Sequence, residues 1–318
     1  MSLVQFLERQ RKKGLLGVVK SVRHRSADLI RGEPIPKTVS KPVAKTQVGS
    51  AKASPPVDSL PEYLALEERS KIIPDKSSIT QFKNRHKGER CFIIGNGPSL
   101  NKMDLSLLEN EFTFAVNGFF YKSDEIGLVP SYYVVEDSHV MKDNAERINN
   151  YRPKIHRFFP TEYKDLVKDN KDTSFFRMNR GFYEGRSPNY GIPRFSTDCA
   201  ERIYCGQSVT IINLQIAHYM GFSEVYLIGM DFSYTIPDSA KVTGLSIEST
   251  EDDPNHFHKD YFGKGKKWHD PQLDRVLLNY RMCDFAYECS GRKIYNASVG
   301  GKLEVFDRKD FNSLFPKK

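Results

Sequence analysis

The stretch CFIIGNGPSL, residues 91–100, is the part of the sequence that decides the fold class. Its first four residues form a continuous apolar run, which is typical of a strand buried on both faces of a parallel sheet. Gly95 and Gly97 follow at once, where glycines allow a tight turn and a close approach to a ligand, and free N–H groups favour an anion. Asn96 and Ser99 add short donors and acceptors. The stretch is equally typical of a tight turn that binds nothing, because such turns need glycine anyway.

This glycine turn matches neither of the common phosphate-binding motifs. It lacks the Gly-x-Gly-x-x-Gly spacing of the dinucleotide fingerprint, and it contains no Gly-Lys-Ser or Gly-Lys-Thr as a Walker loop does. The motif alone therefore does not identify a ligand.

Apolar runs of strand length alternate with segments of helical spacing through the rest of the chain. This alternation predicts an α/β fold with a doubly wound, mostly parallel sheet, whose ligand crevice lies at the carboxyl ends of the strands. Helices are predicted over 208–220, with Gly221 as C-cap, and over 271–288. The predicted strands are 91–94, 112–116, 132–135, 174–177, 224–228 and 293–295.

The positive charge of the chain is confined to its N-terminal fifth. The 318 residues carry 48 Lys and Arg against 40 Asp and Glu, a formal net charge of +8. Residues 1–58 alone hold 12 basic and 4 acidic side chains, so the remainder is neutral. A domain that binds nucleic acid is expected to carry its own patch of basic side chains, and the remainder of this chain has no net charge. We therefore expect no nucleic-acid partner.

The same N-terminal region divides into two predicted segments. Residues 1–31 mix basic and apolar side chains, which predicts a basic amphipathic helix. Such a helix either lies on an anionic membrane surface or stays solvated against the body. Residues 32–60, rich in Pro, Lys, Ser, Ala and Val, predict a flexible linker. We expect one catalytic domain over residues 61–318.

The lack of an expected targeting signal and the pattern of cysteines both indicate a cytoplasmic protein. We expect no transmembrane helix, since no run of about 18 apolar residues occurs, and no secretory signal, because charged residues stand where its apolar core would begin. The five cysteines are scattered and form no Cys-x-x-Cys pair, which is typical of reduced thiols. The sequence predicts a cytoplasmic protein, peripheral on the inner face of the membrane if residues 1–31 bind lipid.

Polar residues follow three further predicted strands at their carboxyl ends. These are Asn117, the pair Glu136 and Asp137, and Asp231. A carboxylate pair there could hold a ribose hydroxyl, a metal ion or a catalytic proton, although Asp137 would equally suit a helix N-cap. Because parallel strands end at one edge of the sheet, we expect these side chains to converge with the glycine turn. We count Asp137 and Asp231 among the candidate nucleotide-binding residues.

A polar stretch over 235–267 predicts a lid-like loop region, because it is too long for an ordinary connection. It contains His256 and His258 and is followed by His269. Three histidines this close together in the sequence could supply a metal site or a general base. We favour a base and predict no metal site, because the histidine spacing does not match metal ligands on a helix. A solvated loop would have the same composition. The candidate lid or phosphate contacts are His256, His258, Tyr261 and Lys264.

Several motifs, taken in order, resemble the bacterial sialyltransferases of glycosyltransferase family 42: the glycine turn, Asn117, YLIGMDF at 226–232 and a histidine leading into a helix. A fuller resemblance is to the related proteins of domain of unknown function 115, which are hydroxymethylpterin diphosphokinase-like. That group shares NHFHKDYFGKG at 255–265 and GRKIYNASVGGKLEVF at 291–306. The resemblance spans roughly residues 90–306 and implies a Rossmann-like nucleotide-binding fold.

The resemblance also implies roles for individual residues. In the sialyltransferases a histidine ahead of the long helix deprotonates the acceptor hydroxyl, and His269 matches it. Tyr234 is the nearest match to a tyrosine that assists phosphate departure, and Tyr261 is a candidate for a second one. Those enzymes hold a CMP-linked nonulosonic acid without a metal. The positions matching their nucleotide contacts are Asn96, Gly97, Ser99 and Asn117, with Ser208 at the helix start.

One departure from the sialyltransferases concerns the end of the third strand. They present an asparagine there, where this chain has Glu136 and Asp137. An anionic pair is unfavourable beside phosphate and carboxylate groups unless it contacts ribose or base hydrogens. The pair therefore bears on which donor is bound rather than on where the nucleotide lies.

Three functions are compatible with these features. The leading hypothesis is a glycosyltransferase that moves a sugar from a nucleotide-activated donor, a CMP-linked nonulosonic acid, to a surface glycan or lipid-linked acceptor, with no cofactor. The alternative is hydroxymethylpterin diphosphokinase-like transfer of diphosphate from ATP, with Mg²⁺ held by Glu136, Asp137 and Asp231. The third is a non-catalytic nucleotide-binding scaffold that residues 1–31 recruit to membranes.

Overall fold

The structure is a computed structural model that describes residues 79–168 and 171–316. The chain divides into two units, Met1–Pro56 and Val57–Lys318, and every described residue lies in the second. The predicted basic segment and linker lie outside the described residues, so the domain boundaries drawn from the sequence stay predictions.

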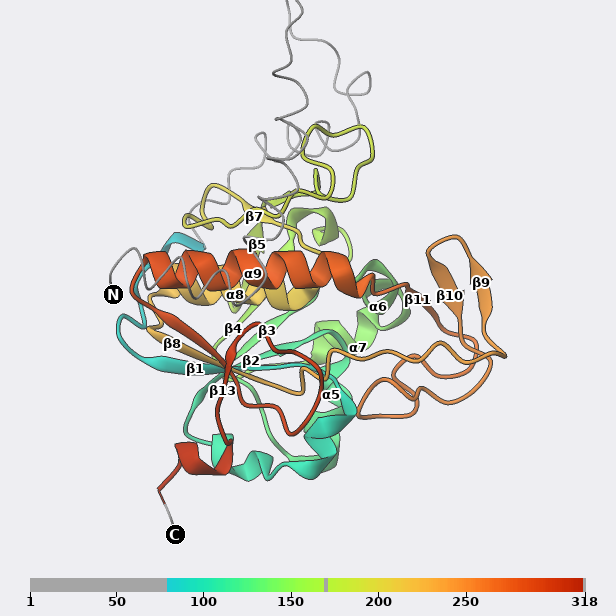
Figure 1. Cartoon of the computed structure of the whole chain (residues 1–318), viewed down its shortest axis with the longest axis horizontal. Coiled ribbons are helices and arrows are strands. Elements are labelled where there is room, and N and C mark those ends of the chain that lie inside the picture. The colour runs from blue at the N-terminus through green and yellow to red at the C-terminus, as the bar shows by residue number, and fades with distance from the viewer. Residues whose placement is uncertain (1–78, 169–170, 317–318) are drawn as a thin grey trace, which may run out of the picture. The chain divides into compact units, whose positions relative to one another are not determined.

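A parallel sheet of eight strands forms the centre of the described ranges, in the order β13-β12-β8-β1-β2-β3-β4-β5 (Figure 1). Each neighbouring pair in it is parallel. Chain order runs outward from β1 on one side and then outward from β8 on the other, so the doubly wound α/β fold is confirmed. The strands are β1 (Arg90–Ile94), β2 (Phe112–Val116), β3 (Tyr132–Val134), β4 (His156–Pro160), β5 (Thr173–Phe176), β8 (Glu224–Ile228), β12 (Lys293–Asn296) and β13 (Asp307–Arg308).

The apolar run at 91–94 forms most of the central strand β1. Phe92 and Ile93 point to opposite faces of β1, and both are 0% exposed. A run that is apolar on both faces is stable only when helices cover both, which is the condition a doubly wound sheet supplies. β1 pairs in register with β8, with Ile94 opposite Ile228, so the two strands end side by side.

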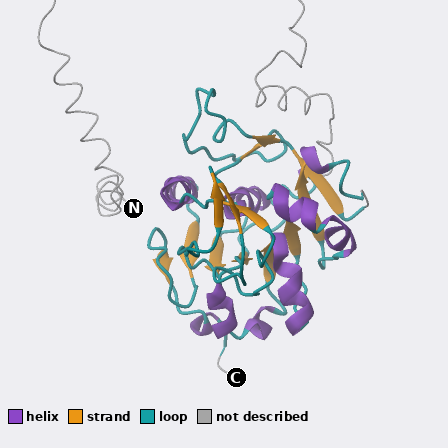
Figure 2. Ribbon diagram, turned by 90° about the vertical axis from the view of Figure 1, so that its right-hand side faces the viewer, coloured by secondary structure: helices purple, strands orange, loops and turns teal. Residues whose placement is uncertain are grey.

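Helices cover both faces of the sheet (Figure 2). Two long helices lie together on one face and share a core with Ile93 and Phe114. Shorter helices contribute to the core on the other face, with Phe92 and Ile94. The long helices are α8 (Val209–Met220) and α9 (Leu273–Cys289), and the shorter ones are α5 (Phe120–Ile126), α6 (Ser138–Asp143) and α7 (Ala145–Asn150).

The predicted ends of α8 are confirmed, whereas α9 begins later than predicted. Ser208 is the N-cap of α8 and accepts a hydrogen bond from the Thr210 N–H, and Gly221 closes the helix at a φ of 94°. The second helix begins at Leu273 and not at 271, because Gln272 has a φ of 45°. A left-handed residue cannot continue a right-handed helix, so the chain turns there before α9 starts.

No strand is predicted over 156–160, yet β4 lies there between β3 and β5. Its polar residues hide the strand in the sequence, because a buried strand is expected to be apolar. Arg157 is 0% exposed, and its guanidinium donates to Thr173 Oγ1 at 2.7 Å and to the Ile148 carbonyl at 3.0 Å. Those partners come from other elements, so only the tertiary structure shows how the charge is accommodated.

The lid-like region of 235–267 contains strands that the sequence does not predict. β9 (Lys241–Thr243), β10 (Ser246–Glu248) and β11 (Lys267–His269) form a small antiparallel sheet, which extends away from the central sheet in Figure 1. A further short pair joins β6 (Met178–Asn179) to β7 (Ile203–Tyr204). β11 ends at His269, one of the predicted site residues.

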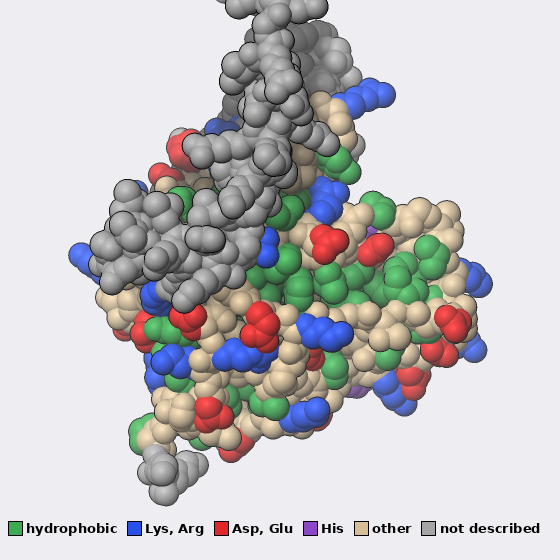
Figure 3. Space-filling view, viewed as in Figure 1, with side chains coloured by type: hydrophobic (Ala, Val, Ile, Leu, Met, Phe, Trp, Pro, Cys, Tyr) green, Lys and Arg blue, Asp and Glu red, His purple; other side chains and the backbone are tan. Residues whose placement is uncertain are grey.

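The outer surface of α9 is partly apolar. Leu278 and Phe285 are 40% and 39% exposed. Figure 3 shows apolar side chains gathered in a band over this helix. Within the described ranges, no helix combines the length and the apolar character needed to cross a membrane.

Candidate functional site

The carboxyl ends of β1 and β8 form the switch point of the sheet. From β1 the chain winds outward through β2 to β5, and it returns to the other side of β1 as β8. In doubly wound sheets the connections from two such strands leave in opposite directions, and ligands bind in the crevice between them. The turn that starts at Gly95 and the turn that starts at Gly229 meet at this point.

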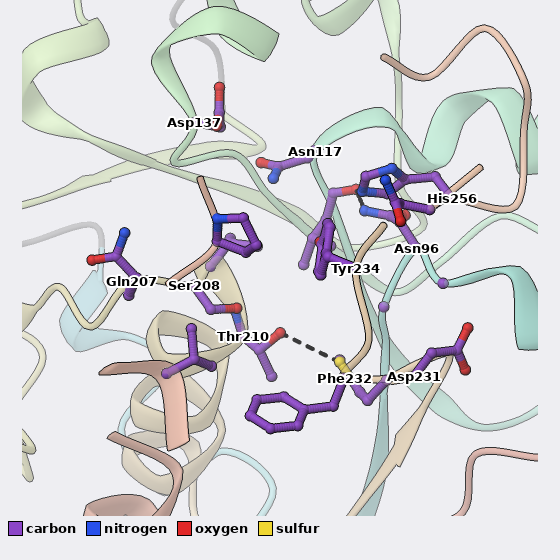
Figure 4. Close-up of a pocket in the computed structure, with 18 of the residues that line it drawn as sticks. Asn96, Asn117, Asp137, Gln207, Ser208, Thr210, Asp231, Phe232, Tyr234 and His256 are labelled. Carbon is purple, nitrogen blue, oxygen red and sulfur yellow. Dashed lines mark hydrogen bonds between the residues drawn. The ribbon is translucent and has the colours of Figure 1, made fainter. Parts of the chain in front are cut away.

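A cavity of about 200 Å³ opens at the switch point (Figure 4). The turns after β1 and β8, the start of α8 and the segment that leads into α9 all line it. Figure 4 places Ser208 and Thr210 on one side of the cavity and Asn96 and His256 on the other, with Tyr234 between them. No lysine or arginine of the described ranges is among its lining residues.

The glycines of the turn are required by close packing against the segment after β8. The Gly97 N–H donates to the Gly229 carbonyl at 2.9 Å, and the Ser99 N–H donates to Asp231 Oδ2 at 2.9 Å. A Cβ at Gly97 would overlap both the Gly229 carbonyl oxygen and the Asp231 carboxylate. The first role of these glycines is therefore to let two turns meet, which also brings their polar groups to one cavity.

Asn96 projects from the glycine turn with its amide orientation set by two acceptors. Its Nδ2 donates to Tyr261 Oη at 2.9 Å and to the Val116 carbonyl at 3.3 Å. Its Oδ1 is buried and has no hydrogen-bond partner among the described residues. A buried acceptor without a donor is costly, so this oxygen is suited to a ligand N–H or O–H.

Asn117, at the end of β2, holds a left-handed backbone conformation with a φ of 47°. Asparagine tolerates this conformation better than most residues. Its backbone carbonyl accepts a hydrogen bond from Tyr133, and its Oδ1 accepts the Glu136 N–H at 3.4 Å. Asn117 therefore ties the end of β2 to the end of β3 at the edge of the cavity.

His269 and Asp137 form a histidine–carboxylate pair in the cavity wall. Asp137 Oδ2 lies 3.6 Å from His269 Nδ1, and Asp137 Oδ1 caps α6 by accepting the N–H groups of His139 and Val140 at 2.8 Å and 2.9 Å. The interaction with Asp137 raises the pKa of His269, although partial burial acts against this. Burial also opposes ionisation of Asp137, yet the contacts with His269 and the Val140 N–H lower its pKa.

Glu136, beside this pair, behaves differently. Burial raises the pKa of Glu136 to about 7, and the neighbouring charge of Asp137 adds to the rise while Arg180 opposes it. Tyr183 Oη donates to Glu136 Oε1 at 3.3 Å. The two adjacent carboxyl groups therefore differ in charge near neutral pH, with Asp137 ionised and Glu136 close to half-protonated.

A second histidine–carboxylate pair lies in the segment between β10 and β11. His256 Nδ1 is 2.7 Å from Asp253 Oδ2, and the two side chains are only 8% and 3% exposed. The His256 ring stacks on Tyr261, with ring centroids 4.1 Å apart and an interplanar angle of 5°. Tyr261 in turn bonds to Asn96, so this pair is joined to the glycine turn.

The N-terminus of α8 supplies the remaining polar wall. Ser208 and Thr210 line the cavity, and Thr210 Oγ1 donates to Met230 Sδ at 3.6 Å. Gln207 precedes the helix at a φ of 68°, and its Oε1 is buried without a partner in the described ranges. The N-terminus of a twelve-residue helix carries partial positive charge, so this wall favours an anionic group.

Comparison with protein families identifies the group to which this fold and site belong. The family model of 6-hydroxymethylpterin diphosphokinase MptE-like proteins matches residues 66–237, more than half of the chain. The chain belongs to this MptE-like family. The match includes the glycine turn, Asp137, Ser208 and Tyr234, and it ends before His256 and His269.

Two further comparisons add little about activity. No curated protein matches the chain. The solved structure of MAf glycosyltransferase from Magnetospirillum magneticum AMB-1 is similar with a TM-score of 0.44 and 15% sequence identity. The similarity covers 76% of this chain and 39% of that one, so the chain spans well under half of that protein's length. A likeness at this level does not establish a shared activity.

Most of the site residues predicted for this MptE-like chain line one cavity, but three do not. Ser99 is buried beside the glycine turn, and its N–H is bonded to Asp231. His258 stacks on Tyr121, with ring centroids 4.8 Å apart, and Lys264 is exposed. Lys264, a candidate lid or phosphate contact, therefore does not line the cavity. The predicted residues that line the cavity are Gly95, Asn96, Gly97, Asn117, Asp137, Ser208, Asp231, Tyr234, His256, Tyr261 and His269.

The carboxylates proposed as Mg²⁺ ligands do not fit that role. Glu136, Asp137 and Asp231 form no group able to hold a metal ion, and the described residues contain no other cluster of three His, Cys, Asp or Glu side chains that could. Asp231 accepts the Ser99 N–H, and Asp137 accepts N–H groups from the first turn of α6 and forms an ion pair with His269. Asp231 Oδ1 is buried without a hydrogen-bond partner among the described residues, but the three carboxylates do not surround one point, as Mg²⁺ requires.

Sequence reasoning missed several lining or supporting residues. Asp253 stands three positions before His256, a spacing that brings side chains together in a turn and was a usable signal. Gln207 and Thr210 flank the predicted N-cap Ser208, so they were bound to lie near the same opening. In contrast, no local signal links Tyr261 to Asn96, because that contact depends on how the segment after β8 folds back.

Proposed function

We propose that this chain is a glycosyltransferase that moves a sugar from a nucleotide-activated donor to an acceptor hydroxyl. The observation that carries the proposal is the His269–Asp137 pair in the wall of a cavity at the switch point of the sheet. A histidine whose Nδ1 faces a carboxylate presents Nε2 as a base. The resemblance to sialyltransferases supports this role for His269, and the donor we propose is a CMP-linked nonulosonic acid.

The other walls of the cavity suit the phosphate and the nucleotide. The N-terminus of α8, with Ser208 and Thr210, offers partial positive charge to a phosphate. The unpartnered Oδ1 of Asn96 offers an acceptor to a base or ribose hydrogen. The absence of lysine and arginine from the lining residues of the described ranges favours a donor with a single bridging phosphate over one with two or three.

The reaction we propose is a direct displacement at the anomeric carbon. The acceptor oxygen forms a bond to that carbon while the bond from the carbon to the phosphate oxygen breaks, and the electron pair leaves with the phosphate. His269 Nε2 takes the proton of the acceptor hydroxyl, and Asp137 stabilises the imidazolium that forms. Tyr234, which also lines the cavity, contributes to the site of the leaving phosphate.

The family to which the chain belongs supports a second candidate, transfer of diphosphate from ATP to a pterin alcohol. That reaction uses Mg²⁺ to neutralise the phosphates. We rank it second because Glu136, Asp137 and Asp231 do not gather as ligands and no lysine or arginine of the described ranges lines the cavity.

We place the reaction at the cytoplasmic face of a membrane, with a surface glycan or lipid-linked glycan as acceptor. The support is the net charge of +8, which resides in residues 1–58 together with many apolar side chains. A membrane location would bring the site close to a lipid-linked acceptor.

A thermal-shift panel tests the proposal against the second candidate. The full chain is heated with CMP, CDP, UDP and ATP, each with and without Mg²⁺. We expect CMP to raise the melting temperature without Mg²⁺. A shift that occurs only with ATP, and only when Mg²⁺ is present, would reject the glycosyltransferase proposal and favour diphosphate transfer.

A further inference from the structure

The leaving phosphate of the proposed reaction needs a proton donor or a positive charge. Among the described residues that line the cavity, neither lysine nor arginine is present to supply the charge. The start of α8 supplies partial charge through its N–H groups, but it has no proton to release. Histidine is the side chain that changes protonation most readily near neutral pH, and two histidines, His256 and His269, line the cavity.

His256 is built into the wall by a buried carboxylate. Its Nδ1 lies 2.7 Å from Asp253 Oδ2, and both side chains are more than nine-tenths buried. The Asp253 carboxylate also accepts the N–H groups of Asn255 and Phe262, at 2.8 Å and 2.9 Å. Burial opposes ionisation of Asp253, but these bonds lower its pKa, so the group is a carboxylate at neutral pH.

Aromatic packing fixes the plane of the His256 ring. Tyr261 stacks on it with ring centroids 4.1 Å apart, and Tyr234 packs edge-on against it at 5.9 Å with an interplanar angle of 73°. Tyr261 Oη bonds to the Asn96 side chain, and the Phe257 N–H donates to the Asn96 carbonyl at 2.8 Å. Two contacts therefore hold His256 next to the glycine turn.

The bonding of His256 leaves one ring nitrogen for a ligand. Nδ1 is committed to Asp253, and Nε2 makes no hydrogen bond to another described residue. When the ring is an imidazolium, Nε2 carries a proton that it can give away. His269 differs, because its side chain is 48% exposed and faces the end of β3. Its greater exposure suits an incoming acceptor, whereas the buried His256 suits the donor phosphate.

We propose that His256, oriented by Asp253, is the general acid that donates the Nε2 proton to the leaving phosphate of the sugar donor. This inference rests on the proposed function and adds the second half of its proton transfer. The two histidine–carboxylate pairs then perform opposite tasks, with His269 as base toward the acceptor and His256 as acid toward the donor.

The proton transfers balance. As the bond between the anomeric carbon and the phosphate oxygen breaks, that oxygen keeps the electron pair and takes the proton from His256 Nε2. The acceptor oxygen bonds to the anomeric carbon and releases its proton to His269 Nε2. After release of the products, His269 loses one proton to water and His256 takes one up, so both return to their starting states.

The pH dependence of this role is set by the groups that face His256. These are Asp253 from its own segment, Tyr261 stacked on one face of the ring and Tyr234 from the segment after β8. Asp253 is ionised and the tyrosines are neutral over the pH range in which histidine titrates. Phosphate binding should therefore be stronger at low pH than at high pH, because an imidazolium offers a proton to the phosphate and a neutral ring nitrogen does not.

Binding of two probes, CMP and inorganic phosphate, tests the role, with cytidine as a probe that lacks phosphate. Calorimetry on the full chain compares wild type, His256→Gln and the matched control His258→Gln at about pH 6.5 and pH 8.5. His258 lies two positions away and outside the cavity lining. We expect His256→Gln to weaken CMP and phosphate binding about 10-fold at the lower pH and to leave cytidine binding unchanged. The control should bind all three like wild type.

Asp253→Asn is the second variant, and melting temperatures identify any variant that fails to fold. Asp253 accepts the N–H groups of Asn255 and Phe262 through separate oxygens, so the single side-chain oxygen of asparagine can still accept one of them, while the charge facing His256 is lost. We expect CMP binding by this variant to lose most of its pH dependence.

In sugar transfer, His256→Gln should lower kcat about 10²-fold with the acceptor KM unchanged.

The possible outcomes separate this inference from the proposed function. If wild type and His256→Gln bind CMP and phosphate equally at both pH values, the acid role is wrong and the nucleotide site stands. If wild type binds phosphate through His256 but binds no nucleotide, the proposed function is wrong and the phosphate contact stands. If wild type binds neither CMP nor phosphate, both are wrong.

Discussion

His269 Nδ1 lies 3.6 Å from Asp137 Oδ2, and this contact joins two elements that are remote in the sequence. Asp137 follows β3 and caps α6, whereas His269 is the last residue of β11 in the small antiparallel sheet. The carboxylate raises the pKa of His269, so the imidazole stays protonated to a higher pH than an isolated histidine. A base must be neutral to accept a proton, and Asp137 therefore helps to set the pH at which the site becomes active.

Replacing Asp137 with asparagine should move the titration of His269 to lower pH. Asn can still cap α6, so the backbone around it should not change. Loss of the negative charge removes the main cause of the raised His269 pKa. NMR titration of the imidazole signals measures the shift directly, and the acid limb of the kcat/KM profile should move in the same direction. An unchanged His269 pKa would show that the contact has no electrostatic effect.

Replacing His269 with alanine should abolish sugar transfer and spare nucleotide binding. The side chain is half exposed, so its loss should affect folding little. Removal of a general base typically costs about 10² to 10⁴ in rate. Transfer is measured with labelled donor, and CMP binding is measured in parallel by thermal shift. Turnover equal to wild type would remove His269 from the mechanism and would require a different base.

Replacing Gly97 with alanine should destabilise the site, because the new Cβ would overlap Asp231 and the Gly229 carbonyl. Overpacking of this kind costs about 1–3 kcal/mol of unfolding free energy. Gly185→Ala is the matched control, since nothing lies within 4 Å of a Cβ there. Urea unfolding should show a loss for the first variant and little change for the second. Equal stability of the two variants would contradict the close meeting of the turns.

Replacing Glu136 with glutamine should change how stability depends on pH. Burial raises the pKa of Glu136 from its ordinary 4.5 to about 7. As the pH rises between these values, the unfolded chain releases a proton that the folded chain retains, so the wild-type protein loses stability. Glutamine does not ionise, and the variant should gain on the order of 1–3 kcal/mol relative to wild type between about pH 5 and pH 8. Urea unfolding at the two pH values measures the difference in unfolding free energy between the variant and wild type. A difference that does not change with pH would argue against the raised pKa of Glu136.

Deleting residues 1–58 should release the protein from anionic vesicles and leave CMP binding unchanged. That segment carries the net charge of +8, and each basic residue near an anionic leaflet contributes about 1 kcal/mol. Co-sedimentation with vesicles of phosphatidylserine and phosphatidylcholine, with phosphatidylcholine alone as control, measures the effect. Vesicle binding that survives the deletion would assign membrane attachment to another part of the chain.

Elements whose residues are uniformly apolar were predictable from local sequence. β2 and β8 have the predicted bounds, and β1 gains only Arg90 at its start. α8 was equally clear because Ser208 and Gly221 mark its two ends. In each case the pattern that predicts the element is the pattern that buries it, so no distant contact was needed.

Elements stabilised by distant partners were not predictable. β4 contains His156 and Arg157, and both side chains are satisfied by other elements, through Ser174 Oγ at 2.6 Å and through Thr173. The short strands of the 235–267 region depend on pairing with each other and lack strong periodicity. Polar residues in these places indicate a loop until their hydrogen-bond partners are known.

Local sequence patterns were enough to predict the α/β class, the central strands and the polar residues at their carboxyl ends, because these follow from burial and from the geometry of parallel sheets. Which of those residues meet depends on the three-dimensional arrangement of the elements. It brought Asp137 to His269, directed the Asp231 carboxylate to the Ser99 N–H and left Lys264 on the surface. Strand order and the path of long connections set these contacts, and neither is encoded in any short stretch of the chain.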